Sequence, residues 1–141
     1  MTRVLAVDDD AGVLRLVDKV LRNAGYDVVC VADGRLALAA LDERVDVLLC
    51  DKNLPEVPGT QVVLEARRLF PKMTTVLMTA APEALALAQL GLDGYLAKPF
   101  RSNALLVHTI EAARQRRHQA MAREQLEGQL IATRGQVQKQ R

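Results

Sequence analysis

The stretch VDVLLCDKNLPEVPG, residues 45–59, changes character at Asp51. Before Asp51 lies an aliphatic run that is too short for a helix and is typical of a buried strand. After it, Pro55 fixes the direction of a loop, and we expect Gly59 to adopt a positive φ ahead of a segment with helical spacing. The stretch therefore predicts a buried strand that ends in a carboxylate and leads through a loop into a helix.

The same alternation runs along the rest of the chain. Short aliphatic runs indicate five strands, over residues 3–7, 28–31, 45–50, 75–79 and 94–97. Helical spacing of apolar residues indicates helices between them, over residues 12–24, 34–43, 60–70 and 83–90. Residues that favour helix ends support these bounds: the caps Asp10 and Asp33, the left-handed candidates Gly25 and Gly91, and Pro71. Together they predict a doubly wound α/β domain, a parallel sheet with helices on both faces.

Ligands of such sheets bind beyond the carboxyl ends of the strands. At these ends the chain places six polar residues: Asp8, Asp9, Asp10, Asp51, Thr79 and Lys98. Crowded carboxylates repel one another, and a shared cation relieves that repulsion. Oxygen ligands favour Mg²⁺, with Asp9 and Asp51 as the first ligands to expect, whereas Asp10 is better explained as a helix cap.

Two further residues at the same edge have both a functional and a structural interpretation. Lys98 could balance the carboxylates or a bound phosphoryl group, or it could form a structural ion pair. The hydroxyl of Thr79 could reach a phosphoryl oxygen, although a threonine at the end of a strand is common for its β propensity alone. The two histidines, His108 and His118, lie far along the chain from this edge and are interpreted as surface residues.

The composition is that of one soluble domain. A chain of 141 residues with 50% hydrophobic residues can bury a core without disulfides. No apolar run is long enough to span a bilayer, and the N-terminus becomes acidic early, so we expect a cytoplasmic protein. Cys30 and Cys50 sit in short aliphatic runs, which predicts two buried, reduced thiols.

The C-terminal part differs from the rest in charge. Residues 1–100 hold 11 Lys and Arg against 14 Asp and Glu, whereas residues 101–141 hold 8 against 3. A helix beginning near Ser102 could continue past the domain, and an apolar seam suited to a coiled coil follows in it: Leu126, Leu130, Thr133 and Val137. We expect this tail to be helical when it packs against a second copy or a downstream helix; an unstructured linker is the alternative.

Four motifs, in chain order, resemble a CheY-like response-regulator receiver domain. They are VDDD at residues 7–10, the acceptor segment DKNLPEVPG at 51–59, MTA at 78–80, and YLAKPF at 95–100, each at a strand end. The resemblance divides the chain into a receiver domain over residues 1–116 and a basic extension over 117–141. It implies a five-stranded sheet of order 2-1-3-4-5 flanked by five helices, with a helical C-terminal extension.

The resemblance also implies roles for individual residues. Asp51 would accept a phosphoryl group, with Asp8 and Asp9 as the acidic pair and the backbone carbonyl of Asn53 completing the protein ligands of Mg²⁺. A phosphoryl oxygen would be bound by Lys98. The switch residues would be Thr79 and Tyr95, and the peptide between Lys98 and Pro99 would be cis. A loose phosphoryl-transfer transition state needs such positioned cations more than proton transfer.

The partners that the resemblance implies are a sensor histidine kinase or phosphotransfer protein and a downstream output protein or domain; the seam of the tail adds a second copy of the chain as a candidate partner. No membrane is implied. Such a protein is a signalling switch rather than an enzyme. Two features depart from the typical pattern: the interval from Thr79 to Lys98 is about three residues shorter, which predicts a curtailed fourth helix, and Lys52, Asn53 and Ala81 occupy variable positions near the acceptor.

Three other functions fit the sequence less well. An enzyme of the haloacid-dehalogenase type would need a second Asp two residues after the nucleophile, where this chain has Asn53. An interaction module of receiver fold without phosphorylation would typically have lost the acceptor, an acidic residue or the lysine, all of which are present. Nucleic-acid binding by residues 117–141 is disfavoured, because they contain no aromatic residue and no helix-turn-helix pattern.

Overall fold

A computed structural model describes residues 1–81 and 90–139, with the side chains of the last helix described as far as residue 132. The elements are β1 (Arg3–Val7), α1 (Ala11–Asn23), β2 (Asp27–Val31), α2 (Gly34–Ala40), β3 (Val47–Asp51), α3 (Gly59–Leu69), β4 (Thr74–Thr79), β5 (Gly94–Ala97) and α5 (Asn103–Lys139). The five strands pair in parallel in the order β2-β1-β3-β4-β5, which confirms the predicted topology. Residues 82–89, which hold nearly all of the predicted fourth helix, lie outside the described residues.

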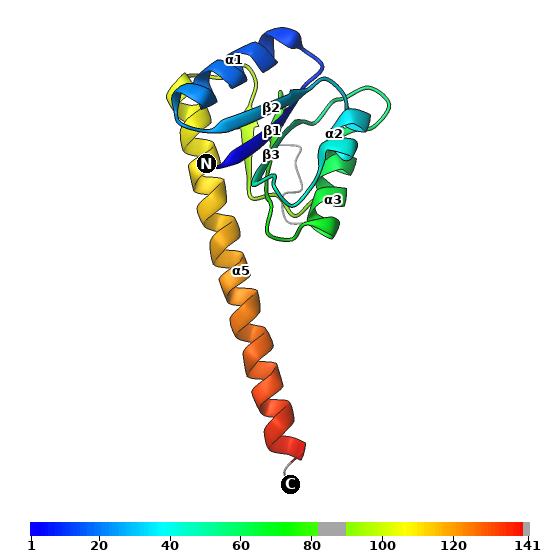
Figure 1. Ribbon diagram of the computed structural model, residues 1–141, viewed down its shortest axis with the longest axis vertical. Helices are drawn as coiled ribbons and strands as arrows, with labels where there is room; N and C mark the ends of the chain where they lie inside the picture. Colours follow the sequence, from blue (N-terminus) through cyan, green and yellow to red (C-terminus); the bar gives the residue numbers. More distant parts are fainter. Residues whose placement is uncertain (82–89, 140–141) are drawn as a thin grey trace.

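Helices cover both faces of the sheet, with α1 and α5 on one side and α2 and α3 on the other (Figure 1). Successive residues of β1 face opposite layers: Val4 and Ala6 pack with α1 and α5, while Leu5 and Val7 pack with α2 and α3. Because both faces of the central strands are buried, their sequences are continuous aliphatic runs rather than alternating ones.

Most helix ends form as predicted. The Asp10 carboxylate accepts hydrogen bonds from the backbone N–H groups of Gly12 and Val13, and Asp33 caps α2 in the same way. Gly25 and Gly91 have φ values of 94° and 68°, in the left-handed region where a side chain would be strained. These local signals fix where the chain turns between layers, and so where each strand ends.

The two cysteines differ in environment, and the prediction for Cys30 is wrong. Cys50 is buried in β3, where burial raises the pKa of its thiol, and both cysteines are free. Cys30 is exposed, because β2 is the edge strand of the sheet and, among the described strands, pairs with β1 alone. A short aliphatic run on an edge strand therefore buries fewer of its residues than the same run in the centre.

Helix α5 belongs partly to the core and partly to a projecting stem. Its first turns begin at a cap formed by Ser102, whose Oγ accepts a hydrogen bond from the backbone N–H of Leu105. Leu106, Ile110 and Ala113 are fully buried against the sheet. The helix then runs on to Lys139, away from the body (Figure 1), which confirms a helical extension. The side chains of the seam residues Thr133 and Val137 lie outside the described residues. Among the helices that the structure describes, none is both long enough and apolar enough to cross a membrane.

A buried ionic network holds α5 at the amino ends of the strands. The carboxylate of Asp93, just before β5, accepts hydrogen bonds of 2.9 Å from the backbone N–H of Thr75 and from Arg67 of α3. The Nε of Arg117 lies 3.5 Å from the same carboxylate, and Arg116 donates to the backbone carbonyl of Asp93. One carboxylate thus joins α3, β4, β5 and α5, the last of them near the point where α5 leaves the body.

The substitution Asp93→Asn is expected to lower the free energy of unfolding by about 2 kcal/mol, since it leaves two largely buried guanidinium groups without their counter-ion. Urea unfolding followed by circular dichroism measures this change. The matched control is Asp42→Asn, whose partner Arg44 is 75% exposed, and there we expect a change below about 0.5 kcal/mol. Equal midpoints for Asp93→Asn and the unmodified chain would contradict a stabilising role for the network.

Candidate functional site

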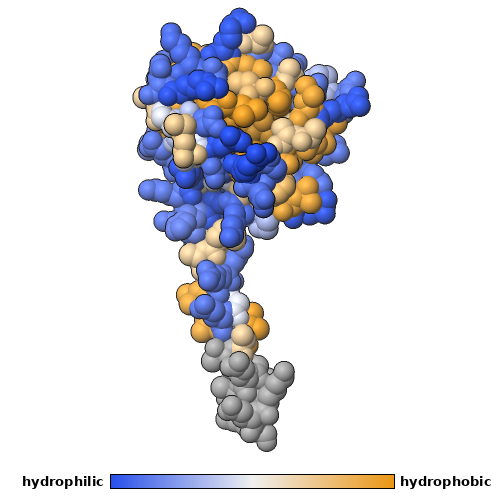
Figure 2. Space-filling model, viewed as in Figure 1, coloured by the Kyte–Doolittle hydropathy of each residue, from blue (hydrophilic) through white to orange (hydrophobic). Residues whose placement is uncertain are grey.

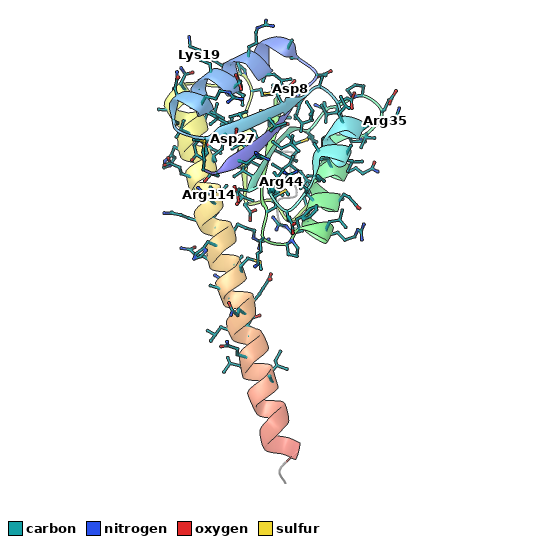
Figure 3. The ribbon with its side chains drawn as sticks, viewed as in Figure 1. Asp8, Lys19, Asp27, Arg35, Arg44 and Arg114 are labelled. Atoms are coloured by element: carbon teal, nitrogen blue, oxygen red, sulfur yellow. The ribbon has the colours of Figure 1, made fainter. Side chains whose placement is uncertain are left out.

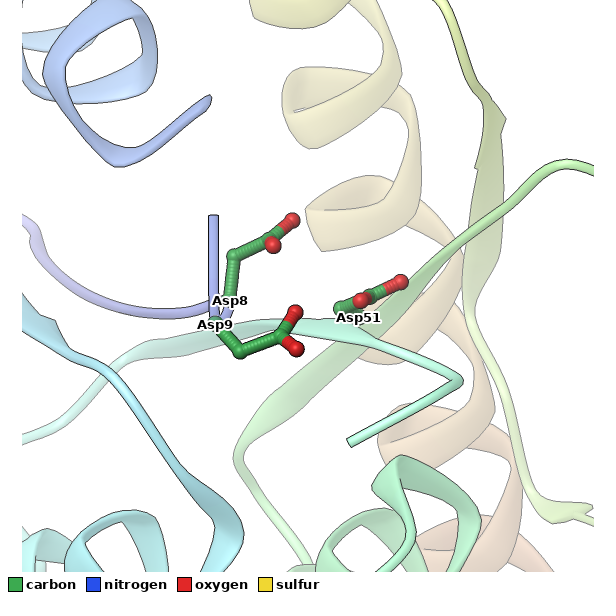
Figure 4. A group of neighbouring side chains, drawn as sticks. All are labelled: Asp8, Asp9 and Asp51. Atoms are coloured by element: carbon green, nitrogen blue, oxygen red, sulfur yellow. The ribbon is translucent and has the colours of Figure 1, made fainter. Parts of the chain in front are cut away.

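Three carboxylates meet at the carboxyl ends of two neighbouring strands. Asp8 and Asp9 follow β1 directly, and Asp51 is the last residue of β3. Because β1 and β3 pair in parallel, with Val7 beside Cys50, these acidic residues lie side by side. One oxygen from each carboxylate lies within 4.8 Å of the other two. Figure 4 shows the three side chains converging on a common space.

The three carboxylates differ in their exposure to solvent. Asp8 is fully buried and Asp51 is 6% exposed, whereas Asp9 is exposed to solvent. In Figure 3, Asp8 lies at the upper end of the sheet, while Lys19 and Arg35 project outward from α1 and α2. The cluster is therefore open to solvent on the side of Asp9, and a solute can approach it there.

Lys98 supplies a positive charge to this cluster from the end of β5. Its Nζ donates a hydrogen bond of 2.8 Å to Asp8 and lies 3.6 Å from Oδ1 of Asp51. Partial burial alone would lower the pKa of Lys98, but the hydrogen bond to Asp8 and the charges of Asp51 and Asp8 outweigh this effect and raise it. Lys98 is therefore charged at neutral pH and sits between two acidic side chains.

The electrostatic balance at Asp51 is unfavourable for its charge. Burial, followed by the neighbouring charge of Asp8, raises the pKa of Asp51 above that of an ordinary carboxyl group. Lys98 and a hydrogen bond from the backbone N–H of Asn53 oppose this shift without cancelling it. Three carboxylates with one nearby lysine thus leave an excess of negative charge, which an added cation would relieve.

The residues present fit a magnesium ion. Mg²⁺ takes oxygen ligands at about 2.1 Å in an octahedron, so two of its ligands lie at most about 4.2 Å apart. The carboxylate oxygens, within 4.8 Å of one another, would move closer together to share one ion. Exposure of Asp9 leaves room for water to complete the shell. This donor set of carboxylates alone suits a hard cation better than zinc or copper.

Thr79 and the cis peptide also lie at this end of the sheet. Thr79 ends β4 and is 1% exposed, and its Oγ1 accepts a hydrogen bond of 3.1 Å from the backbone N–H of Ala81. The peptide between Lys98 and Pro99 is cis, as the resemblance implied. Tyr95, by contrast, is 45% exposed on β5. The fold therefore gathers most of the predicted residues at one edge and leaves Tyr95 at the surface.

The loop after Asp51 depends on Gly59 for a reason different from the one predicted. The positive φ of this loop falls at Glu56, with a value of 64°, and not at Gly59. Gly59 is needed for close approach: a Cβ built there would lie 1.9 Å from the backbone carbonyl oxygen of Asp51. The backbone N–H of Gly59 also donates to the carbonyl of Lys52. The first residue of α3 is thus packed directly against the end of β3.

The site and the fold agree with a comparison against known families. The chain matches the response regulator receiver domain over residues 4–110, and it belongs to that family. Proteins of this family act as switches in two-component signal transduction. The resemblance to CheY-like domains is confirmed by this match and by the solved structures described next.

Three relatives, one of them with a solved structure, illustrate the similarity. The chemotaxis protein CheY4 of Vibrio cholerae shares 34% of its sequence, with a TM-score of 0.74 over 80% of this chain and 98% of that one. The transcriptional regulatory protein GlrR of Escherichia coli is 36% identical over 72% of this chain and 24% of its own length. CpxR of Klebsiella pneumoniae, also a transcriptional regulatory protein, is 35% identical over 84% of this chain and 51% of its own length. The chain spans about a quarter to a half of these curated relatives.

Proposed function

We propose that the chain accepts a phosphoryl group on Asp51 and transmits the signal by a change of shape. The observation that carries this proposal is the meeting of Asp8, Asp9 and Asp51 with Lys98 at one edge of the sheet. The donor would be a phosphohistidine of a sensor histidine kinase or of a phosphotransfer protein. Membership of the receiver family supports this reading, and so does the approach to the site from solvent.

In the proposed reaction, an oxygen of Asp51 forms a bond to phosphorus while the bond from phosphorus to the imidazole nitrogen of the donor breaks. Asp8, Asp9, Asp51 and the backbone carbonyl of Asn53 would hold Mg²⁺, which would neutralise charge on the transferring group. Lys98 would exchange part of its contact with Asp8 for a phosphoryl oxygen. The Asp8 carboxylate also accepts a hydrogen bond from the backbone N–H of Asp10, which keeps it in position.

The proposed switch runs from Thr79 to Tyr95. Thr79 would release the backbone N–H of Ala81 and donate its hydroxyl to a phosphoryl oxygen, which shifts the segment after β4. The side chain of Tyr95, nearly half exposed in this structure, would then change its rotamer and alter the surface around β5 and α5. A ligand can drive such a change only if it binds one state better than the other, and the phosphoryl contacts of Lys98 and Thr79 provide that difference.

The remaining features fit a cytoplasmic signalling protein that is not an enzyme acting on a separate substrate. Residues 1–116 would form the receiver domain and residues 117–141 an extension toward an output protein or domain. The named relatives that are transcriptional regulators extend well beyond the matched part, which supports an output outside this receiver. Asn53 in place of a second acid argues against an enzyme of the haloacid-dehalogenase type.

Removal of one metal-binding carboxylate tests this proposal. The substitution Asp9→Ala removes an exposed carboxylate and should leave the fold intact while abolishing labelling by acetyl phosphate in the presence of Mg²⁺. Intact mass spectrometry, with and without a chelator, reports the added phosphoryl group. The unmodified chain should gain it only when Mg²⁺ is present. Full labelling of Asp9→Ala, or labelling of the unmodified chain that persists in the presence of the chelator, would contradict the metal assignment.

A further inference from the structure

The loop between β3 and α3 contains a strained turn. Glu56 has a φ of 64°, in a region that residues with side chains rarely adopt. The backbone N–H of Val57 donates a hydrogen bond of 2.7 Å to the carbonyl of Pro55, which closes a three-residue turn around Glu56. A γ-turn with a positive φ at its centre is the rarer and more strained form. Because such a conformation persists only where its surroundings hold it, contacts outside the turn must fix it.

Two apolar side chains attach this loop to the body. Leu54 is 8% exposed near the start of the loop, and Val57 packs against the core near its end. The hydrogen bond from Gly59 to Lys52 closes the base of the loop. Figure 1 shows the loop curving past the first turn of α2. The strained turn thus lies directly before the side chain that attaches the far end of the loop.

Gly34, the first residue of α2, provides the surface on which Val57 rests. Gly34 is buried, and a Cβ built on it would lie 2.4 Å from the carbonyl oxygen of Val57 and 2.8 Å from its Cβ. The φ of Gly34 is not positive, so close approach rather than backbone conformation requires glycine here. In a close-packed contact of this kind, any larger residue would displace Val57 or the start of α2.

A second contact between the loop and α2 is too exposed to hold the turn. Arg35 lies 3.5 Å from the carboxylate of Glu56, and the two side chains are 74% and 69% exposed. Ion pairs this exposed contribute little to stability. Figure 2 shows apolar surface on this side of the body with hydrophilic residues at its margin. The apolar contact of Val57 with Gly34 is therefore the one that holds the loop against α2.

The same loop carries Asn53, whose backbone N–H donates a hydrogen bond to the carboxylate of Asp51. We propose that Gly34 is a positioning residue for the magnesium site: by letting Val57 dock on α2, it holds the loop so that the backbone carbonyl of Asn53 faces the metal. The inference rests on the proposed function, in which that carbonyl is a ligand. Groups that orient metal ligands from outside commonly affect metal affinity as well as the ligands themselves do.

An NMR titration of the full chain with Mg²⁺ alone, followed by the chemical shifts of its backbone amides, tests this inference without phosphorylation. Gly34→Ala should raise the dissociation constant for Mg²⁺ about tenfold, as loss of an outer orienting contact typically does. Because no ligand is removed, labelling by acetyl phosphate should still reach its full extent once the Mg²⁺ concentration is raised to match. If Gly34→Ala does not fold, Val57→Ala, which adds no atom, decides the question by a shift in the same direction.

Two variants serve as matched controls. Arg35→Ala removes the exposed contact between the loop and α2, and it should change the dissociation constant by less than about twofold. Asp93→Asn lowers stability from the opposite end of the strands and should leave Mg²⁺ binding unchanged. A general loss of stability would therefore be distinguished from a displaced loop.

An unchanged Mg²⁺ affinity in a folded Gly34→Ala would overturn the inference, and so would an equal loss of affinity in Asp93→Asn. If the unmodified chain binds Mg²⁺ and is labelled, either result refutes the role of Gly34 alone. An unmodified chain that shows no saturable Mg²⁺ binding and takes up no phosphoryl group would instead overturn the proposed function, and this inference with it.

Discussion

Asp51→Asn is expected to abolish phosphorylation of the chain by acetyl phosphate and by a phosphorylated histidine donor. The amide keeps the size and shape of the carboxyl group but offers no anionic oxygen to attack phosphorus. It also removes one of three carboxylates that lie within 4.8 Å of one another, so Mg²⁺ should bind more weakly. Intact mass after incubation with the donor measures the effect, which should be a complete loss of the added phosphoryl group.

The same substitution should not unfold the protein. Burial and the charge of Asp8 disfavour ionisation of Asp51, so the neutral amide relieves repulsion in the metal-free domain. The matched control is Asp10→Asn, which changes the acidic residue that directly follows Asp8 and Asp9. Asp10 caps α1, and Asn is an equally good cap, so this variant should be labelled normally. If Asp51→Asn were labelled as strongly as the unmodified chain, Asp51 would not be the phosphoryl acceptor.

Gly59→Ala is expected to lower the free energy of unfolding by about 3 kcal/mol or more, the largest change in stability we expect from one methyl group in this chain. The added Cβ would lie 1.9 Å from the carbonyl oxygen of Asp51 and 2.8 Å from its carbonyl carbon. Both are backbone atoms of a buried strand, so relief requires a shift of α3 or of the end of β3. Urea unfolding measures the loss.

Gly128→Ala, in the part of α5 that projects from the body, is the matched control for Gly59→Ala. Apart from the adjacent turns of its own helix, no atom of the described residues lies within 4 Å of a Cβ added there, and alanine is favoured over glycine inside a helix by about 1 kcal/mol. The unfolding midpoint of this variant should stay the same or rise. If Gly59→Ala unfolded at the midpoint of the unmodified chain, the close packing of α3 against Asp51 would not be a constraint on this site.

Much of the fold could be predicted because its signals are local. The run RVLAV forms a central strand with both faces buried, so its hydrophobicity alone identified β1 with correct bounds. Asp10 could be separated from Asp8 and Asp9, since one cap satisfies a helix end and the other two carboxylates needed a different explanation. The order of the strands and the cis peptide came instead from the resemblance to a known family, which pattern reasoning alone would not have supplied.

What escaped prediction depends on contacts between distant residues. The exposure of Cys30 follows from the position of β2 at the sheet edge, which its own sequence does not reveal. Asp93 meets Arg67 across 26 positions and Arg117 across 24, and no pattern within one element predicts that pairing. Gly59 was assigned a positive φ because glycine commonly has that role, whereas the tertiary approach of α3 to β3 is what requires it.

The continuity of α5 has a mechanical consequence. The helix is held in the body near Ile110 and runs unbroken to Lys139, a length of about 44 Å at 1.5 Å per residue. A tilt of about 5° at the body would displace the far end by about 4 Å over that length. Because displacement grows in proportion to the distance from the pivot, the same tilt would move a point 4 Å from the pivot by only about 0.4 Å. A helix that tilted in this way would act as a lever, with its short arm inside the receiver and its long arm reaching whatever the stem contacts.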